Sequence, residues 1–296
     1  MKKLALGFSL CLLLISSVCA ANDQTGTSGA AFLKLGQSVR AASLGGSFVA
    51  LADDPSTIFY NPAGLQLSGY NRLSFTQTNW LVGSSYSTIC YARPIGLHDS
   101  FGLAISSVSF GGIQETTPTS RTGTGRFFAP GSILGVFSWA RDMRWAYLGV
   151  NAKIMRQNID AYQEDGMGID LGVLTRTPIE NLRLGASVLN LGWSGDKALP
   201  QTLLLGVDYE TNFGAALVGD LRMPRDADST VHIGVEYRPI AFLILRGGFN
   251  NRDVEGSGGN YSLGLGLNFL NFNLDYAYVP YAELGETHRA GVTVKL

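Results

Sequence analysis

The chain has 296 residues and a formal net charge of −1; 15% of its residues are charged, 46% are hydrophobic and 37 are glycine. Its lysines and arginines are scattered and form no basic patch, which argues against a nucleic-acid partner. After residue 20 no apolar run reaches the ~20 residues that a transmembrane helix needs. The apolar residues therefore belong either to a soluble all-β core or to alternate positions of strands.

Residues 1–20, MKKLALGFSLCLLLISSVCA, begin with two lysines, continue as a short apolar run and end in small residues. This pattern predicts a secretory signal peptide that is cleaved before Ala21. The residues before Cys19 do not fit a lipoprotein signal. Cleavage leaves Cys90 as the single cysteine, which excludes an intramolecular disulfide and a C-x-x-C site. We expect Cys90 to be an ordinary residue of an apolar surface.

Residues 21–69 form the second predicted segment, in which residues 30–68 do not alternate. They contain helix-like patches rich in Ala and Leu, which are interrupted by Gly36, Gly45 and Gly46 and end at Asp53-Asp54-Pro55. A segment this apolar is expected to pack somewhere. A wide barrel leaves a lumen that its own side chains cannot fill, and larger barrels are known to be plugged. We therefore expect a partly helical N-terminal plug, or hatch, inside a barrel.

Residues 70–296 follow the period of two that is typical of strands. In residues 231–238, for example, Val231, Ile233 and Val235 oppose the more polar His232, Gly234 and Glu236. The polar faces consist largely of Gly, Ser and Asn with isolated charges of both signs. Glycine-rich inward positions suit the curved wall of a membrane barrel better than the solvent face of a soluble sheet.

About fourteen antiparallel strands are expected, an even number that is typical of bacterial outer-membrane barrels. Spanning strands must close on themselves, because open edges in hydrocarbon leave backbone groups unpaired. The fold class predicted is all-β, a transmembrane outer-membrane barrel. The expected strands cover 70–79, 84–94, 99–112, 127–140, 143–157, 165–176, 182–192, 200–210, 212–223, 229–239, 241–251, 260–269, 271–280 and 287–296.

The connections are expected to alternate between short periplasmic turns and longer external loops. The longer ones cover 115–126, 157–165, 192–199, 251–259 and 280–286. Aromatic residues near strand ends are compatible with interfacial girdles; they are Trp80, Tyr86, Trp139, Trp145, Tyr209, Tyr237, Tyr276 and Tyr278.

Residues 26–96 resemble the amino-terminal part of the PorV/PorQ family, which is itself similar to the FadL-like outer-membrane transporters of long-chain fatty acids. The matching pieces are the Gly-Thr-Ser start, Arg40-Ala41-Ala42-x-Leu44-Gly45-Gly46, Ala50-Leu51-Ala52-Asp53-Asp54, Asn61-Pro62-Ala63-Gly64 and the strand pair from Trp80 to Tyr91. The resemblance implies a fourteen-stranded barrel with an internal hatch that contains the Asn-Pro-Ala turn.

For FadL-like relatives the resemblance implies diffusion of hydrophobic molecules through the wall or lumen. The function expected here is porin-like, passive uptake of a hydrophobic or small amphipathic molecule, which binds in an apolar pocket near the external end before the hatch rearranges. For PorV and PorQ the resemblance implies association with type IX secretion, although the compact loops of this chain argue against a cargo shuttle. A purely structural surface protein is a third alternative.

Two sets of residues are candidates for the site. In the hatch, Asn61 to Gly64 is either a gate or a rigid turn in which Gly64 permits a left-handed residue. Asp53 and Asp54 either latch the hatch to an arginine such as Arg40 or end a helix. Mixed charges on inward faces favour a structural lumen network over an ion-selective ring. The hatch set is Arg40, Asp53, Asp54, Asn61, Pro62, Ala63 and Gly64, and the lumen set is Arg183, Asp208, Asp220, Arg222, Glu236, Arg238, Arg246, Asp275 and Arg289.

No motif indicates an enzyme. The histidines are His98, His232 and His288, and the chain has no G-x-S-x-G elbow, zinc spacing or phosphate loop. We therefore expect no catalytic residue, no metal site and no cofactor. The expected partners are outer-membrane lipid, a hydrophobic small molecule, the barrel-assembly machinery during biogenesis and, in the alternative function, secretion-system proteins.

Overall fold

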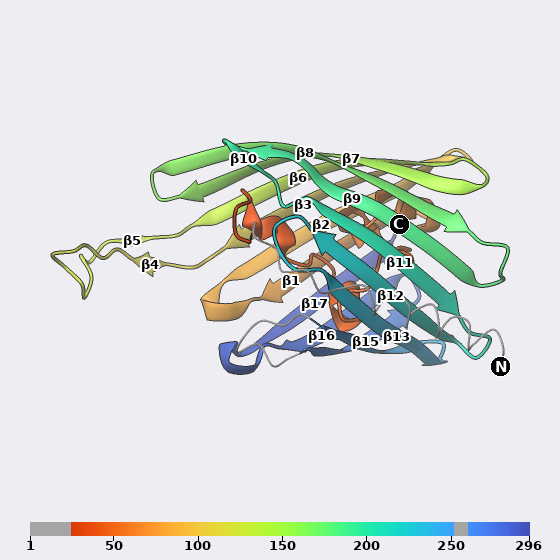
Figure 1. The fold of residues 1–296 in the computed structure, drawn as a ribbon. Helices are drawn as coiled ribbons and strands as arrows, with labels where there is room; N and C mark the ends of the chain where they lie inside the picture. Colours follow the sequence, from red (N-terminus) through yellow and green to blue (C-terminus); the bar gives the residue numbers. More distant parts are fainter. Residues whose placement is uncertain (1–24, 252–259) are drawn as a thin grey trace.

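The computed structural model describes residues 25–251 and 260–296, and its main feature is a closed antiparallel barrel (Figure 1). Each wall strand pairs with the next, β8 pairs with β9, and β1 pairs with β17. The wall strands are β1 (Arg72–Asn79), β2 (Ser85–Ile95), β3 (Asp99–Ser109), β6 (Gly131–Asp142), β7 (Ala146–Ile159), β8 (Tyr162–Arg176), β9 (Leu182–Ser194), β11 (Thr202–Glu210), β12 (Ala215–Pro224), β13 (Thr230–Ile240), β14 (Leu243–Asn250), β15 (Tyr261–Phe269), β16 (Phe272–Pro280) and β17 (Glu286–Lys295). The predicted barrel of about fourteen strands is confirmed. No helix in the described part of the chain is long and apolar enough to cross a membrane.

The wall has an apolar outer face and a polar or small inner face. In β13 the side chains of Ile233 and Val235 are exposed, whereas His232 and Glu236 are buried. Exposed apolar side chains recur around the barrel, which is the arrangement that lipid requires on the outside of spanning strands. Closure gives every wall strand two hydrogen-bonded neighbours, so the wall has no open edge.

Short turns gather at one end of the barrel, which we call the short-turn end, and longer connections gather at the other, the long-loop end. The longest connection covers 110–130, contains β4 (Ile113–Gln114) and β5 (Phe127–Phe128), and projects well beyond the wall (Figure 1). Another, between β9 and β11, contains β10 (Lys197–Ala198). The expected long loop at 157–165 is wrong, because β7 and β8 continue to a turn at residues 160–161, where Asp160 adopts a φ of 55°. The loop expected at 251–259 lies almost entirely outside the described residues.

The segment ahead of β1 crosses the lumen from the long-loop end to the short-turn end; we call its described residues, 25–69, the hatch. Near its start the Gly29 N–H donates to the Ala198 carbonyl at 2.9 Å, and near its end Gln66 Nε2 donates to the His98 carbonyl at 2.7 Å. Its elements are η1 (Ala31–Lys34), α2 (Val39–Ser43), η2 (Pro55–Phe59) and η3 (Pro62–Leu67); two further 3-10 turns, η4 (Leu81–Gly83) and η5 (Ala282–Leu284), lie in long-loop connections.

The structure places two residues of β2 in the lumen. Tyr86 does not belong to an outer aromatic girdle, since it faces the lumen, is 1% exposed and packs beside Trp80. Cys90 faces the lumen on the same strand and is also buried. Alternation alone could place both residues on one face of β2, but it could not decide which face turns inward.

Candidate functional site

One side of the lumen, the inward face of β2, β3 and β6, is neutral. Every buried residue of these three fully described strands is uncharged, and we call this surface the neutral wall: Tyr86, Thr88, Cys90, Ala92, Ser100, Gly102, Ala104, Ser106, Val108, Ser132, Leu134, Val136, Ser138 and Ala140. Its apolar members form one cluster with Phe32, Ile58 and Leu65 of the hatch. A largely apolar surface, interrupted by Ser and Thr hydroxyls, therefore runs along the lumen beneath the hatch. Two of these hydroxyls, on Thr88 and Ser106, donate to Gln37 Oε1 of the hatch at 2.7 and 2.8 Å.

The contact between the hatch and the neutral wall is close. A Cβ atom added at Gly102 would lie 2.8 Å from Ile58 Cδ1 and 3.1 Å from Leu65 Cδ1. Nearer the long-loop end, Phe32 of η1 is 5% exposed and belongs to the same cluster as Met155 and Leu199. The hatch thus occupies the apolar space that a hydrophobic solute would need.

The other side of the lumen carries charges, and Arg40 of the hatch connects to them. Arg40 Nε donates to Glu236 Oε2 at 2.7 Å, and its Nη2 donates to Glu236 Oε1 at 3.0 Å. Glu236 also accepts from Arg246 Nε at 2.8 Å and from Arg238 Nη2 at 2.9 Å, and Arg246 Nη1 donates to Asp275 Oδ1 at 2.6 Å. Arg40, Glu236 and Arg246 are all less than 9% exposed. We call these five residues the latch.

Asp53 and Asp54 have separate structural roles within the hatch. Asp53 accepts a hydrogen bond from Arg40 Nη1, while Asp54 lies 3.5 Å from the same nitrogen. Asp54 also caps the start of η2, because its Oδ1 accepts from the Ser56 N–H at 2.8 Å. Burial raises the pKa of the Asp54 carboxyl above its ordinary value, and the charge of Arg40 opposes that shift. The pair therefore begins a 3-10 helix and does not end one.

Other predicted lumen residues lie in smaller groups. Asp220 accepts from the backbone N–H groups of Phe48 and Val49 at 2.6 and 3.0 Å, which fixes the middle of the hatch to β12. Arg222 lies half-buried two residues further along that strand. Arg183 Nη2 donates to Asp208 Oδ2 at 2.6 Å and to Glu210 Oε1 at 2.8 Å.

Arg289 is placed differently from the other predicted charges. Its Nη1 donates to the Gly36 carbonyl at 3.3 Å and to the Tyr86 hydroxyl at 3.2 Å, and its guanidinium lies 5.1 Å from the centre of the Trp80 ring. Within the described part of the chain its charge makes no ion pair with a carboxylate. The structure therefore does not bring Arg289 into the predicted charge network.

Asn61 to Gly64 form a tightly packed turn near the short-turn end. Asn61 is fully buried, and its Nδ2 donates to the carbonyls of Val49 and Val173, both at 3.0 Å. Its Oδ1 accepts from Ala63 N–H at 3.2 Å, which caps η3, and Pro62 occupies the first helical turn. Gly64 has no positive φ, so the expected left-handed residue is wrong. Space requires glycine here, because a Cβ would lie 2.2 Å from the Ala52 carbonyl oxygen.

A second close approach joins the hatch to β13 and β14. The Leu44–Gly46 turn lies against inward glycines, and a Cβ at Gly248 would lie 1.9 Å from the Gly45 nitrogen. The Gly45 N–H donates to Ser262 Oγ at 2.9 Å, and His232 Nδ1 lies 2.6 Å from the Gly45 carbonyl oxygen. At this place only backbone separates the hatch from the outer surface of the wall.

Sequence reasoning missed two ion pairs. Lys153 Nζ lies 2.7 Å from Asp170 Oδ2 in the lumen, with both side chains less than 5% exposed. Lys34 of η1 lies 2.5 Å from Asp226, which follows β12 at the long-loop end. Burial acts to raise the pKa of Asp226, but hydrogen bonds from Lys34 and Ser28 outweigh it and lower that pKa. The alternation of β7 already placed Lys153 inward, whereas nothing local pairs residues 34 and 226.

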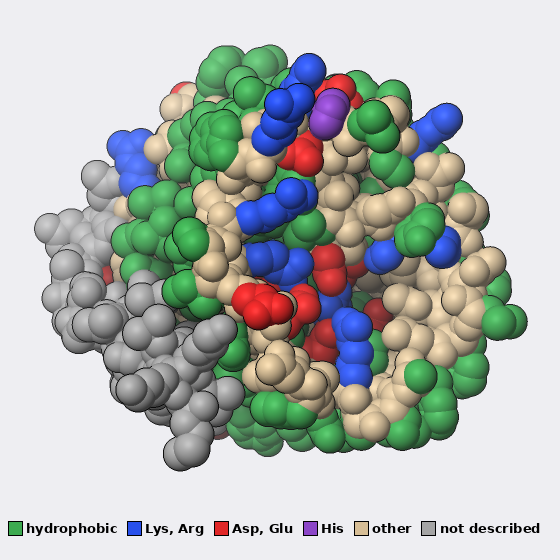
Figure 2. All heavy atoms as spheres, turned by 90° about the vertical axis from the view of Figure 1, so that its right-hand side faces the viewer, with side chains coloured by type: hydrophobic (Ala, Val, Ile, Leu, Met, Phe, Trp, Pro, Cys, Tyr) green, Lys and Arg blue, Asp and Glu red, His purple; other side chains and the backbone are tan. Residues whose placement is uncertain are grey.

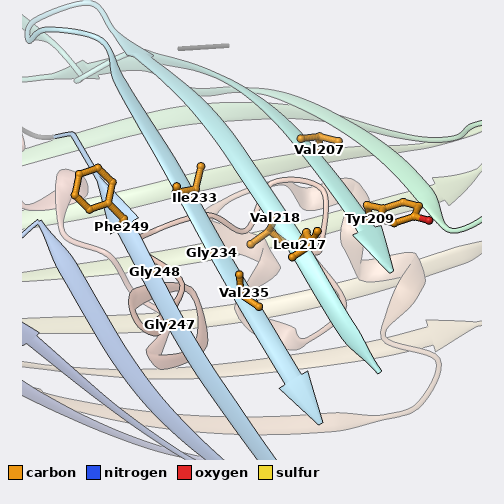
Figure 3. A pocket seen from close by; sticks show the side chains of 10 residues that line it. All are labelled: Val207, Tyr209, Leu217, Val218, Ile233, Gly234, Val235, Gly247, Gly248 and Phe249. Atoms are coloured by element: carbon orange, nitrogen blue, oxygen red, sulfur yellow. The ribbon is translucent and has the colours of Figure 1, made fainter. Parts of the chain in front are cut away.

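The short-turn end of the barrel is charged at its centre, and two pockets lie elsewhere on the molecule. Figure 2 shows that acidic and basic side chains gather across the centre of the short-turn end, with apolar side chains at its rim. An apolar pocket of about 290 Å³ lies on β11 to β14 (Figure 3). A pocket of about 250 Å³ at the long-loop end includes Lys197, Arg225 and Asp226, so it does not match the apolar pocket expected there. Among the described residues no cluster of three or more His, Cys, Asp or Glu could hold a metal ion.

The fold is shared with several proteins of known structure. No family model and no curated protein matches the chain. Solved structures do match. The toluene transporter TodX of Pseudomonas putida is 12% identical with a TM-score of 0.65, over 86% of this chain and 95% of that one. A FadL homologue of Pseudomonas aeruginosa is 13% identical with a TM-score of 0.60, over 94% and 99%. The toluene transporter TbuX of Ralstonia pickettii is 17% identical with a TM-score of 0.59, over 86% and 96%.

These similarities concern the fold. The chain shares with these structures a closed barrel, which here has fourteen wall strands and few helices. Several of the matching structures are described as transporters or channels. These structural similarities do not test the resemblance to the PorV/PorQ family.

Proposed function

We propose that this protein is a passive channel for hydrophobic or small amphipathic molecules, gated by its hatch, in the outer membrane of a Gram-negative-type bacterium. The observation that carries the proposal is the two-sided lumen, in which the hatch covers a continuous neutral wall on one side and is held by charges on the other. The proposed organisation is a signal peptide in 1–20, a hatch in 21–69 and a barrel in 70–296. The fold shared with hydrocarbon channels supports the same proposal.

The proposed mechanism begins at the long-loop end, where Phe32 fills apolar space beside Met155 and Leu199. A hydrophobic solute takes the place of the η1 turn and then of Ile58 and Leu65 along the neutral wall. Each displaced apolar contact is replaced by an apolar contact with the solute, so little apolar surface becomes exposed to water. The latch keeps the hatch inside the barrel during this motion.

The experiment uses proteoliposomes and compares uptake of toluene with uptake of glucose. The variant Val108→Thr/Val136→Thr adds two hydroxyls to the neutral wall at nearly constant shape, and Val218→Thr adds one on β12, facing the other side; all three valines are less than 5% exposed. We expect toluene uptake to fall in the double variant and to persist in the control. Equal uptake in both variants would refute the neutral-wall path, and rapid glucose uptake by the native protein would indicate a water-filled pore.

One observation favours the alternative of a component in a type IX protein secretion complex. The 110–130 connection projects from the barrel (Figure 1), and Phe127 on it is 64% exposed. Ile113, which pairs with the neighbouring Phe128, is also 43% exposed, and a group of exposed apolar side chains on a projecting hairpin is suited to a protein partner. Co-purification of secretion proteins with the native chain, and its loss in Phe127→Ser, would support this alternative. Toluene uptake that survives Phe127→Ser would separate the two functions.

A further inference from the structure

The apolar pocket on β11 to β14 is a groove on the outer surface of the wall. Ile233, Val235 and Phe249 line it, and their side chains are 38%, 45% and 47% exposed on the face opposite the hatch. Figure 3 shows these side chains on neighbouring strands, with Gly247 and Gly248 between them. The groove therefore faces the membrane.

Strand register explains why the wall is hollow here. Tyr209, Leu217, Val235 and Gly247 stand opposite one another across β11 to β14 and form one outward row. The next row, one step toward the long-loop end, contains Val207, Gly219, Ile233 and Phe249. Each row contains a glycine, and a Cβ added at Gly247 would meet nothing within 4 Å. The missing side chains leave an oblique groove between neighbours that do not fill it.

The chemistry of the groove identifies its occupant. Among its described lining residues none is charged, and the Tyr209 hydroxyl is the one side-chain polar group. Tyr209 lies near the short-turn end of β11, and tyrosines at such positions turn their polar tip toward lipid head groups. At about 290 Å³ the groove is roughly twice the size of an engineered 150 Å³ cavity that binds benzene. It is also open along the surface, which suits an extended chain.

We propose that this groove seats one acyl chain of a membrane phospholipid, with the head group beside Tyr209 and the chain extending past Val235 and Ile233 to Phe249. The groove continues into the lipid-facing surface of the barrel at Leu245 and Leu263, which are 42% and 55% exposed. The seated chain packs on the strand backbone that carries the hatch turn on its other side, since Gly248 contacts Gly45 there. This inference requires that the barrel spans a membrane and does not depend on the proposed transport.

The test places the full-length barrel in nanodiscs that contain a phospholipid with a photoactivatable diazirine near the middle of one acyl chain. Cross-linked peptides are then mapped by mass spectrometry. We expect the peptides around Leu217, Val235 and Phe249 to be labelled more strongly than other outward segments. Gly247→Phe fills the groove and should reduce their labelling to the level of the remaining wall. Gly135→Phe is the matched control, because Gly135 lies on the exposed face of β6 away from the groove.

Two results would overturn the inference. The first is uniform labelling around the barrel, or groove labelling that Gly247→Phe leaves unchanged. The second is loss of groove labelling when toluene is added, with the remaining wall unaffected, because the occupant would then be a small apolar solute. Retained fold in both variants is checked by circular dichroism.

Discussion

Replacing Arg40 by glutamine is expected to loosen the hatch without unfolding the barrel. Arg40 makes two hydrogen bonds to Glu236, at 2.7 and 3.0 Å, and both side chains are buried. Removing one partner of a buried ion pair costs ~3–5 kcal/mol. The cost should be lower here, about 2 kcal/mol, because Glu236 retains Arg246 and Arg238. At ~1.4 kcal/mol per factor of ten, the population with a displaced hatch should rise roughly 30-fold.

Cys90 provides an assay for this change. It is the single cysteine after residue 20, lies on the neutral wall in contact with the cluster that contains Ile58 and Leu65, and is 1% exposed. A water-soluble maleimide should therefore label it mainly when the hatch moves. We expect the labelling rate to rise roughly 30-fold in Arg40→Gln, in proportion to the displaced population. Cys90→Ser shows the background.

The matched control is Arg156→Gln, which breaks the exposed pair between Arg156 and Asp165 on the outside of the barrel. Exposed ion pairs contribute little to stability, so the labelling rate should stay close to that of the native protein. If both arginine variants label Cys90 at the same rate, the latch does not hold the hatch. The heat-modified electrophoretic mobility of each variant verifies that the barrel remains closed.

Three further predictions follow from the contacts of the hatch. Gly248→Ala should lower the thermal unfolding temperature and raise Cys90 labelling, because its Cβ would lie 1.9 Å from the Gly45 nitrogen; Gly247→Ala, with free space, should change neither. Asn61→Ala should destabilise the barrel by about 1–3 kcal/mol in urea unfolding, because it removes the buried hydrogen bonds from Asn61 Nδ2 to the Val49 and Val173 carbonyls; native-like stability would contradict this. Asp226→Asn tests the ion pair between Lys34 and Asp226. Because folding lowers the pKa of Asp226, the ion pair adds to the stability of the folded state above the ordinary pKa of 3.8. This added stability is lost as the pH falls through the folded pKa. The stability difference between the native protein and Asp226→Asn should therefore shrink on acidification below about pH 4, and a constant difference would exclude the pair.

The sequence predicts the wall well, because the residues of each strand alternate according to what its two faces contact. In β13 the alternation of Ile233 and Val235 with His232 and Glu236 follows directly from lipid on one side and the hatch on the other. Strand ends are less well determined, since the polar residues 157–165 suit a loop as well as the extended β7–β8 hairpin. Pairing across the strands supplies the hydrogen bonds that extend this hairpin, and local sequence does not contain that information.

The lumen is less predictable, because its contacts join residues far apart in the chain. Opposite charges on inward faces predicted a mixed network, but they did not predict that Glu236 would bind Arg40 across 196 positions. The alternation of β17 places Arg289 inward, but it does not show which residues Arg289 contacts. In the structure these are Tyr86 and Trp80, and not a carboxylate of the predicted network. The reason for glycine at positions 64 and 248 is the close approach of another backbone segment, which the local sequence does not show.

The uneven distribution of charge around the lumen also determines which motion of the hatch costs least. Moving the hatch off the neutral wall breaks mainly apolar contacts at ~25 cal/mol per Å² of exposed surface, which an entering hydrophobic solute replaces. The same motion also breaks hydrogen bonds between uncharged groups, such as those that Gln37 accepts from Thr88 and Ser106. Moving it off β12 to β14 breaks the bonds of Arg40 with Glu236 and of Asp220 with the hatch backbone. A hydrophobic solute offers no replacement for those bonds, and a buried charge left without its partner is strongly destabilising. We infer that an entering hydrophobic solute tilts the hatch away from β2, β3 and β6 while the latch stays closed, whereas without a solute the hatch leaves the wall only when the latch opens. A variant that only weakens the latch should therefore expose Cys90 without improving uptake.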